Sequence, residues 1–133
     1  MNSALIIIDM QNDFCTGGAL AVKDGEKIIQ CINDAQKEFK TIILTQDWHP
    51  QEHSSFASNH GAEPYTNIDM EYGSQILWPD HCVQGSTGAD FHRDLNTNKS
   101  DLILRKGSNP KIDSYSAFFE NDKNTTTGLE GYL

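Results

Sequence analysis

An acidic residue and a histidine stand two positions apart at the end of an apolar run. Residues 42–50 read IILTQDWHP, and the run ends in Asp47 and His49 before a proline stops it. Because alternate residues of an extended segment point to the same side, both side chains can reach one metal ion. A site made of two imidazoles and one carboxylate then needs one more histidine. The spacing leaves four candidates open: His53, His60, His81 and His92.

Two other apolar runs also lead into residues that can do chemistry. Residues 4–8 (ALIII) are followed by Asp9, and residues 101–104 (DLIL) lead through Arg105 to Lys106. In open α/β sheets, ligands bind outside the carboxyl ends of the strands. A carboxylate, a candidate metal site and a cation would therefore meet at one crevice. Each alone is also typical of a solvated strand end, but together they predict a functional site.

The elements that must position these residues follow from the apolar pattern. Residues 4–8 are a short apolar run and residues 40–44 (KTIIL) end in one, and both predict strands buried on both faces. Between them, residues 24–39 carry apolar side chains at helical spacing: Ile28, Ile29, Ile32, Ala35 and Phe39. This order indicates a parallel strand–helix–strand unit. Residues 50–100 are rich in Ser, Asn, Gly and Pro and predict a long functional loop with short helices, and residues 127–133 begin a second amphipathic helix.

Composition narrows the class of protein. The 133 residues suit one domain, and the net charge of −9 with a pI of about 4.8 argues against a nucleic-acid partner. No apolar run is as long as a membrane span, and the N-terminus lacks the pattern of a signal peptide. Three cysteines without a CxxC pair indicate a reduced, cytoplasmic protein: Cys15, Cys31 and Cys82.

Several longer motifs occur together and in order along the chain. They read IIIDMQNDFCTGGALAV, TQDWHP, HSSF, LWPDHCVQG, ADFH, RKG and DSYSAF. As a set they resemble the nicotinamidases of the isochorismatase-like cysteine hydrolase superfamily, and the resemblance covers essentially the whole chain. It implies an α/β fold with three α-β-α layers around a parallel sheet. The C-terminal part of that sheet is expected to be missing, so that residues 1–133 form a single, truncated domain.

The resemblance also implies a metal site and a substrate pocket. Asp47, His49 and His81 match the metal ligands, so His81 is the expected third donor, and His53 ranks below these three as a fourth ligand. The expected ion is divalent, Zn²⁺ first, with Fe²⁺ and Mn²⁺ as alternatives. Three aromatic residues match those that line the nicotinamide pocket: Phe14, Trp78 and Tyr115.

The implied reaction is the hydrolysis of nicotinamide to nicotinate and ammonia, a step of NAD salvage. A cysteine thiolate attacks the amide carbonyl and forms a thioester as ammonia leaves. Asp9 matches the group that takes the thiol proton, and Lys106 matches the lysine that keeps Asp9 and the thiolate charged. The metal is expected to bind the pyridine nitrogen and orient the ring. Nicotinamide is the expected partner, and a homo-oligomer is left open.

The nucleophile is the missing part of this expectation. In the family it follows a later strand, beyond the lysine and the GLxGYL helix, whereas this sequence stops at Leu133. Cys15 lies in the loop after the first strand, and Cys82 should face away from the metal because it adjoins His81 in an extended segment. Cys31 is expected to pack within the helix. None of the three matches the family's nucleophile.

Two alternatives stand beside the nicotinamidase hypothesis. One is a sister hydrolase of the same superfamily that acts on another small amide or on isochorismate. The isochorismate branch lacks the metal triad, so Asp47, His49 and His81 argue against it. The other is a catalytically inactive, metal-binding remnant, which the absence of the expected cysteine favours.

Overall fold

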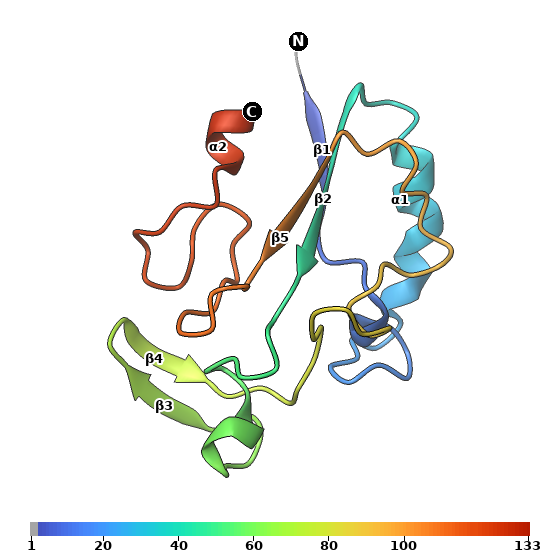
Figure 1. The fold of residues 1–133 in the computed structure, drawn as a ribbon. Helices are drawn as coiled ribbons and strands as arrows, with labels where there is room; N and C mark the ends of the chain where they lie inside the picture. The colour runs from blue at the N-terminus through green and yellow to red at the C-terminus, as the bar shows by residue number, and fades with distance from the viewer. Residues whose placement is uncertain (1–2) are drawn as a thin grey trace.

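A three-stranded parallel sheet forms the centre of the molecule. The computed structural model describes residues 3–133. Strands β1 (Ala4–Ile7), β2 (Thr41–Asp47) and β5 (Leu102–Lys106) pair in the order β1-β2-β5, all parallel (Figure 1). The predicted strand–helix–strand unit is confirmed. Strands β2 and β5 are longer than predicted at their carboxyl ends, so that Asp47 and Lys106 are their last residues.

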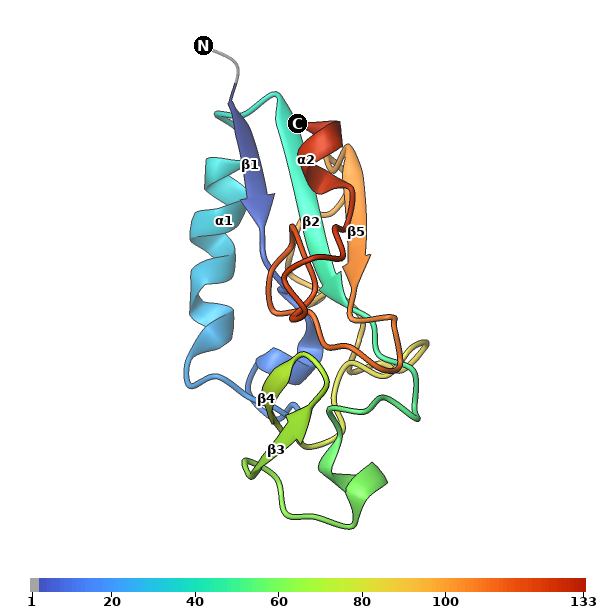
Figure 2. The same ribbon diagram turned by 90° about the vertical axis from the view of Figure 1, so that its left-hand side faces the viewer.

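Helical segments cover both faces of this sheet and make three layers. Helix α1 (Ile29–Ala35), which follows a 3₁₀ turn at Gly25–Ile28, covers one face. Helix α2 (Leu129–Tyr132) and part of the loop that follows β5 cover the other, as the two views show (Figures 1 and 2). The arrangement agrees with the predicted three-layer α/β fold. Within residues 3–133, neither α-helix has the length and apolar character needed to cross a membrane.

The central strand β2 explains why an unbroken apolar run is needed here. Ile42 and Leu44 pack into the cluster on the α1 side, whereas Ile43 packs on the α2 side. Alternate side chains of a strand point to opposite faces, so a strand covered on both sides must be apolar throughout. The edge strand β1 is less buried than predicted, and only Ile7 is fully covered. It pairs with β2 alone in the described part of the chain.

The predicted bounds of the first helix, residues 24–39, and the predicted burial of two of its side chains are wrong. The α-helix begins at Ile29 and not at residue 24, and Ile28, in the preceding 3₁₀ turn, is 54% exposed. Cys31 is also exposed, contrary to the expectation that it packs. The tighter 3₁₀ turn changes the angle between successive side chains, so a period of 3.6 residues counted across it assigns the wrong face.

The region between β2 and β5 contains a hairpin that the sequence pattern did not predict. A 3₁₀ turn at Ala57–His60 agrees with the short helices expected there. Strands β3 (Asn67–Met70) and β4 (Gly73–Ile76) then pair antiparallel, with Met70 opposite Gly73. Each strand has only four residues. Residues 67–70 (NIDM) alternate polar and apolar side chains, but residues 73–76 (GSQI) do not, so the alternation that marks strands is short and is confined to one of the two.

Candidate active site

The three predicted strand ends meet at one edge of the sheet. Asp47 and Lys106 are direct partners in the β2–β5 ladder, and Asp9 follows β1 on the other side of β2. Asp9 has a positive φ of 48°, a conformation that non-glycine residues adopt rarely and most often at turns or functional sites. The expectation that parallel strands bring these side chains together is therefore met by the geometry.

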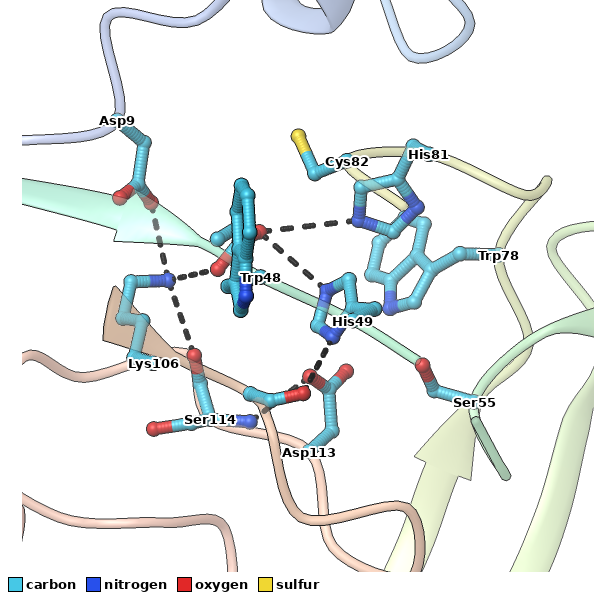
Figure 3. Close-up of polar contacts among 12 residues, drawn as sticks. Asp9, Trp48, His49, Ser55, Trp78, His81, Cys82, Lys106, Asp113 and Ser114 are labelled. Atoms are coloured by element: carbon cyan, nitrogen blue, oxygen red, sulfur yellow. Dashed lines mark hydrogen bonds and ion pairs between the residues drawn. The ribbon is translucent and has the colours of Figure 1, made fainter. Parts of the chain in front are cut away.

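Lys106 connects the two carboxylates. Its side chain is buried, and its Nζ lies 2.9 Å from Asp9 Oδ2 (Figure 3). It also forms an ion pair with Asp47. It further donates to the carbonyl oxygen of Ser114 at 3.0 Å. Burial alone would lower the pKa of Lys106, but the two carboxylates outweigh it and raise the pKa above its usual value. Lys106 is therefore a fixed cation between two acids.

Asp9 is held in a state suited to proton transfer. The hydroxyl of Thr45 donates to Asp9 Oδ1 at 2.6 Å, and the backbone N–H of Asp9 donates to the same hydroxyl oxygen at 3.1 Å. Burial and the charge of Asp47 raise the pKa of Asp9, while Lys106 and Thr45 lower it by less. A carboxyl whose pKa is raised toward neutrality is the kind of group that serves as a general acid or base.

Asp47, His49 and His81 form a compact set of candidate metal donors. The Nε2 atoms of His49 and His81 lie 3.6 and 3.7 Å from Asp47 Oδ2. Each imidazole also has Nδ1 at 2.8 Å from a backbone carbonyl oxygen, that of Gly107 for His49 and that of Pro79 for His81. A carbonyl can only accept, so both Nδ1 atoms carry protons and both Nε2 lone pairs point inward.

Gly107 is required for this orientation of His49. It has a positive φ of 70°, and a Cβ atom at this position would collide with the His49 ring. Burial would lower the pKa of His49, but its contacts with Asp47 outweigh that effect and raise it. Because of this collision, a substitution at Gly107 would displace the His49 ring and so disturb the candidate donor set.

His53 lies beside this set without joining it directly. It is fully buried, with its ring centroid 4.5 Å from that of His49, and His53, His49 and Asp113 form a second group with metal-ligand spacing. The backbone N–H of Ser55 donates to its Nδ1 at 3.1 Å, so the neutral ring carries its proton on Nε2, which has no hydrogen-bond partner among the described residues. Burial and the neighbouring His49 lower the pKa of His53 to about 4. His53 is therefore a neutral imidazole next to the site.

A cavity of about 210 Å³ opens onto the acidic cluster. The predicted aromatic residues Phe14, Trp78 and Tyr115 all line it, and the rings of Phe14 and His81 meet edge to face with centroids 5.8 Å apart. The remaining lining residues are Asp9, Leu20, Asp47, His81, Lys106 and Asp113. The cavity thus combines apolar aromatic walls with a charged floor, an arrangement typical of small-molecule sites.

Three polar residues of the site were not predicted. Gln11 is fully buried, donates to the backbone oxygens of Asp47 and Ala89, and accepts from the Asp47 N–H at 2.8 Å. Thr45 binds Asp9 as described above, and Asp113 lines the cavity. All three fall within motifs noted in the sequence, but no motif indicates which distant group its members contact.

The cysteines stand apart from this chemistry. Cys15 and Cys82 are buried, and within residues 3–133 no cysteine lines the cavity. Burial raises the pKa of both buried thiols, most strongly that of Cys82. A thiol with a raised pKa is protonated at neutral pH and is a poor nucleophile.

Comparison with known proteins gives a consistent set of similarities. A family model described as the isochorismatase domain matches residues 3–133. A nicotinamidase of Acinetobacter baylyi is 54% identical over 133 residues, which are 99% of this chain and 62% of that protein.

Solved structures extend these similarities to the fold. The structure of an Acinetobacter baumanii nicotinamidase and pyrazinamidase superposes with a TM-score of 0.97 at 55% identity, over 98% of this chain and 64% of that one. The pyrazinamidase of Pyrococcus horikoshii, solved in complex with zinc, gives a TM-score of 0.69 at 36% identity, over 98% and 62%. The chain thus spans less than two-thirds of the length of each of these three relatives.

Proposed function

This chain belongs to the isochorismatase family, and from that premise we propose that it supplies the substrate-binding and proton-transfer parts of a nicotinamidase. The proposed reaction is the hydrolysis of nicotinamide to nicotinate and ammonia, which would place the protein in NAD salvage. The observation that carries the proposal is the position of Lys106, whose Nζ contacts both Asp9 and Asp47. It joins the candidate proton-transfer group to the candidate metal site in one buried cluster.

We assign a divalent metal to Asp47, His49 and His81. Two imidazole Nε2 atoms and one carboxylate oxygen, all buried and mutually close, are donors that suit Zn²⁺, Fe²⁺ or Mn²⁺. Buried His53 lies beside them, with an Nε2 that has no hydrogen-bond partner among the described residues, and it ranks below these three as a fourth ligand. The zinc in the related pyrazinamidase favours zinc. When bound, such an ion supplies a Lewis-acid contact that holds a pyridine nitrogen.

The remaining residues fit the demands of amide hydrolysis. The aromatic walls formed by Phe14, Trp78 and Tyr115 suit a flat ring, and Asp9 lies on the same cavity to accept the proton of an attacking thiol. Asp9 would give this proton to the departing nitrogen, so that it leaves as ammonia, and would then take a proton from the water that attacks the thioester. The fixed positive charge of Lys106 favours the ionised forms of both Asp9 and a nearby thiolate.

We propose that the nucleophile comes from the part of the relatives' length that this chain does not span. A mainly apolar pocket of about 260 Å³ lies beside Asp9, just after the end of β1, and is lined by Ile8, Met10, Phe14, Val22 and Ile28. Ile8, Val22 and Ile28 are each more than half exposed. An exposed apolar surface of this kind is typical of a face that packs against further protein, and here it ends beside the candidate proton acceptor.

Equilibrium binding of nicotinamide tests the proposal on this chain. Trp78 lines the cavity and Trp48 does not, so a Trp48→Phe variant reports on the cavity through the fluorescence of Trp78 alone. We expect saturable quenching by nicotinamide when the protein is loaded with zinc, and no quenching with a chelator or in the His81→Ala variant. Zinc-loaded protein that shows no saturable response to nicotinamide would contradict the proposal.

A further inference from the structure

Gln75, on strand β4, is a buried amide that joins the hairpin to the loop after β5, and the two segments lie close in both views (Figures 1 and 2). It is 1% exposed. Its Nε2 donates to the Tyr115 hydroxyl oxygen at 2.9 Å and to Asp113 at 3.2 Å, besides a contact within its own strand. Its Oε1 accepts from the Tyr72 hydroxyl at 2.9 Å and from Asn121 Nδ2 at 3.2 Å.

These partners hold the amide in one orientation. Two donors converge on Oε1, so the carbonyl end must face Tyr72 and Asn121 and the NH₂ end must face Tyr115 and Asp113. Burying an amide is costly unless its hydrogen bonds are made. The orientation of Gln75 is therefore set by the fold before any ligand binds.

The fixed orientation of Gln75 determines the hydrogen bonding of the Tyr115 hydroxyl. Its oxygen accepts from Gln75 Nε2 and also from Trp78 Nε1 at 3.3 Å. A phenolic oxygen has two acceptor positions and one O–H, so both acceptor positions are taken. Toward a ligand in the cavity, the Tyr115 hydroxyl can then act as a donor only. The same contacts fix Tyr115 against Trp78, with ring centroids 6.2 Å apart at 75°.

We propose that Gln75 is a positioning residue for ligand binding: it aligns Tyr115 with Trp78 and makes the Tyr115 hydroxyl a hydrogen-bond donor toward the ligand. Gln75 does not line the cavity and acts through Tyr115. The inference rests on the proposed function, because it takes a pyridine carboxamide as the ligand. On this proposal the β3–β4 hairpin, which carries Gln75, contributes to the selection of ligands that have a hydrogen-bond acceptor.

A double-mutant cycle tests this role with nicotinamide as the probe and zinc-loaded Trp48→Phe protein as the background. Gln75→Met keeps the length of the side chain and removes the amide. We expect it to weaken nicotinamide binding about tenfold, the value of one well-placed hydrogen bond. In a Tyr115→Phe background the same change should have little further effect, because the group through which Gln75 acts is already gone.

Two additional variants separate positioning from general stability. Gln36→Met removes another buried amide, 1% exposed and on the α1 side of the sheet, and should leave nicotinamide affinity unchanged. Tyr72→Phe removes one donor to Gln75 Oε1 without touching the cavity and should weaken binding about threefold. It also keeps the inference testable if Gln75→Met fails to fold. Zinc affinity, measured by calorimetry, should be the same in all of these proteins.

The outcomes distinguish the two proposals. If the parent protein does not bind nicotinamide, the proposed function fails and this inference fails with it. If the parent binds and Gln75→Met binds equally well, the role of Gln75 is overturned and the proposed function stands. Equal losses from Gln75→Met with and without the Tyr115→Phe change would also overturn it, because Gln75 would then not act through the hydroxyl. If Gln75→Met does not fold, unchanged nicotinamide binding in Tyr72→Phe would overturn the role of Gln75 instead.

Discussion

Asp47 and Lys106 are partners across the β2–β5 ladder, and their side chains form an ion pair at the carboxyl end of both strands. Lys106 also contacts Asp9, which follows β1. One cation therefore ties together all three strands of the sheet at the point where the cavity opens. The arrangement makes the candidate metal site and the candidate proton acceptor parts of a single electrostatic unit.

Removing the cation should strongly destabilise the metal-free protein. Lys106→Met would leave Asp9 and Asp47 buried without their shared positive partner. Breaking a buried ion pair from one side typically costs about 3 to 5 kcal/mol, and we expect a loss of this order in urea unfolding with a chelator present. The exposed Lys27, paired with Asp24, provides the control, and Lys27→Met should cost less than about 1 kcal/mol. Equal effects of the two substitutions would contradict the account.

Asp47 should make the metal-free protein sensitive to acid. Burial alone would raise its pKa, but its contacts with His49 and His81 and the charge of Lys106 hold the pKa well below the ordinary value of 3.8. As pH falls, the unfolded chain takes up the proton first, so the stabilisation is present above pH 3.8 and is lost below it.

The comparison of two variants isolates this effect. The free energy of unfolding should fall less steeply between about pH 4 and pH 2 in Asp47→Asn than in the parent protein. Asp69→Asn, a change at an exposed position in β3, should follow the parent. If the free energy of unfolding of Asp47→Asn fell with pH as steeply as that of the parent, the proposed effect of Asp47 would be wrong.

Zinc binding should distinguish between the two overlapping donor groups. His49 belongs to both, whereas His81 belongs to the group with Asp47 and His53 to the group with Asp113. We expect His81→Ala to abolish stoichiometric zinc binding in calorimetry and His53→Ala to weaken it without abolishing it. The exposed His60 serves as a control whose alanine variant should bind zinc normally. Normal zinc binding by His81→Ala would show that the ligand assignment is incorrect.

Gly107 should be needed for both stability and zinc affinity. A methyl group there would collide with the His49 ring in addition to straining a backbone with φ of 70°. Gly85 has a similar φ of 76° but open space around it, so Gly85→Ala carries the strain without the collision. We expect about 1 kcal/mol of destabilisation in Gly85→Ala, more in Gly107→Ala, and a zinc affinity at least about tenfold lower in Gly107→Ala alone. Equal zinc affinities in the two variants would argue against the role of Gly107.

The sequence predicted the location of the site well because that location depends on strand ends. A short apolar run marks a strand, and in a parallel sheet every strand delivers its last residues to the same edge. Asp9, Asp47 and Lys106 could therefore be placed together before the structure was known. The contact between Lys106 and Asp47 could not be predicted, because it depends on the register of β2 against β5.

The parts that escaped prediction depend on polar residues and long-range contacts. Gln11 and Gln75 are buried amides whose partners lie tens of residues away, and no local pattern marks such a residue. The strands of the β3–β4 hairpin have four residues each and only β3 alternates polar and apolar side chains, so the pattern by which strands are recognised is short there. Ile28 was assigned to the core because a regular helical period was continued across a 3₁₀ turn.

The central claim is that residues 1–133 provide the acid–base and metal-binding half of an amidase, and a chimera tests it most directly. Residues 1–133 would replace the matching segment of the Acinetobacter baylyi nicotinamidase, which is 54% identical. Ammonia release from nicotinamide should be retained in this chimera and should fall at least about a hundredfold when it carries Asp9→Asn or Lys106→Met. A folded, zinc-binding chimera that releases no ammonia above a metal-only blank, or one that keeps its rate without Asp9, would contradict the claim.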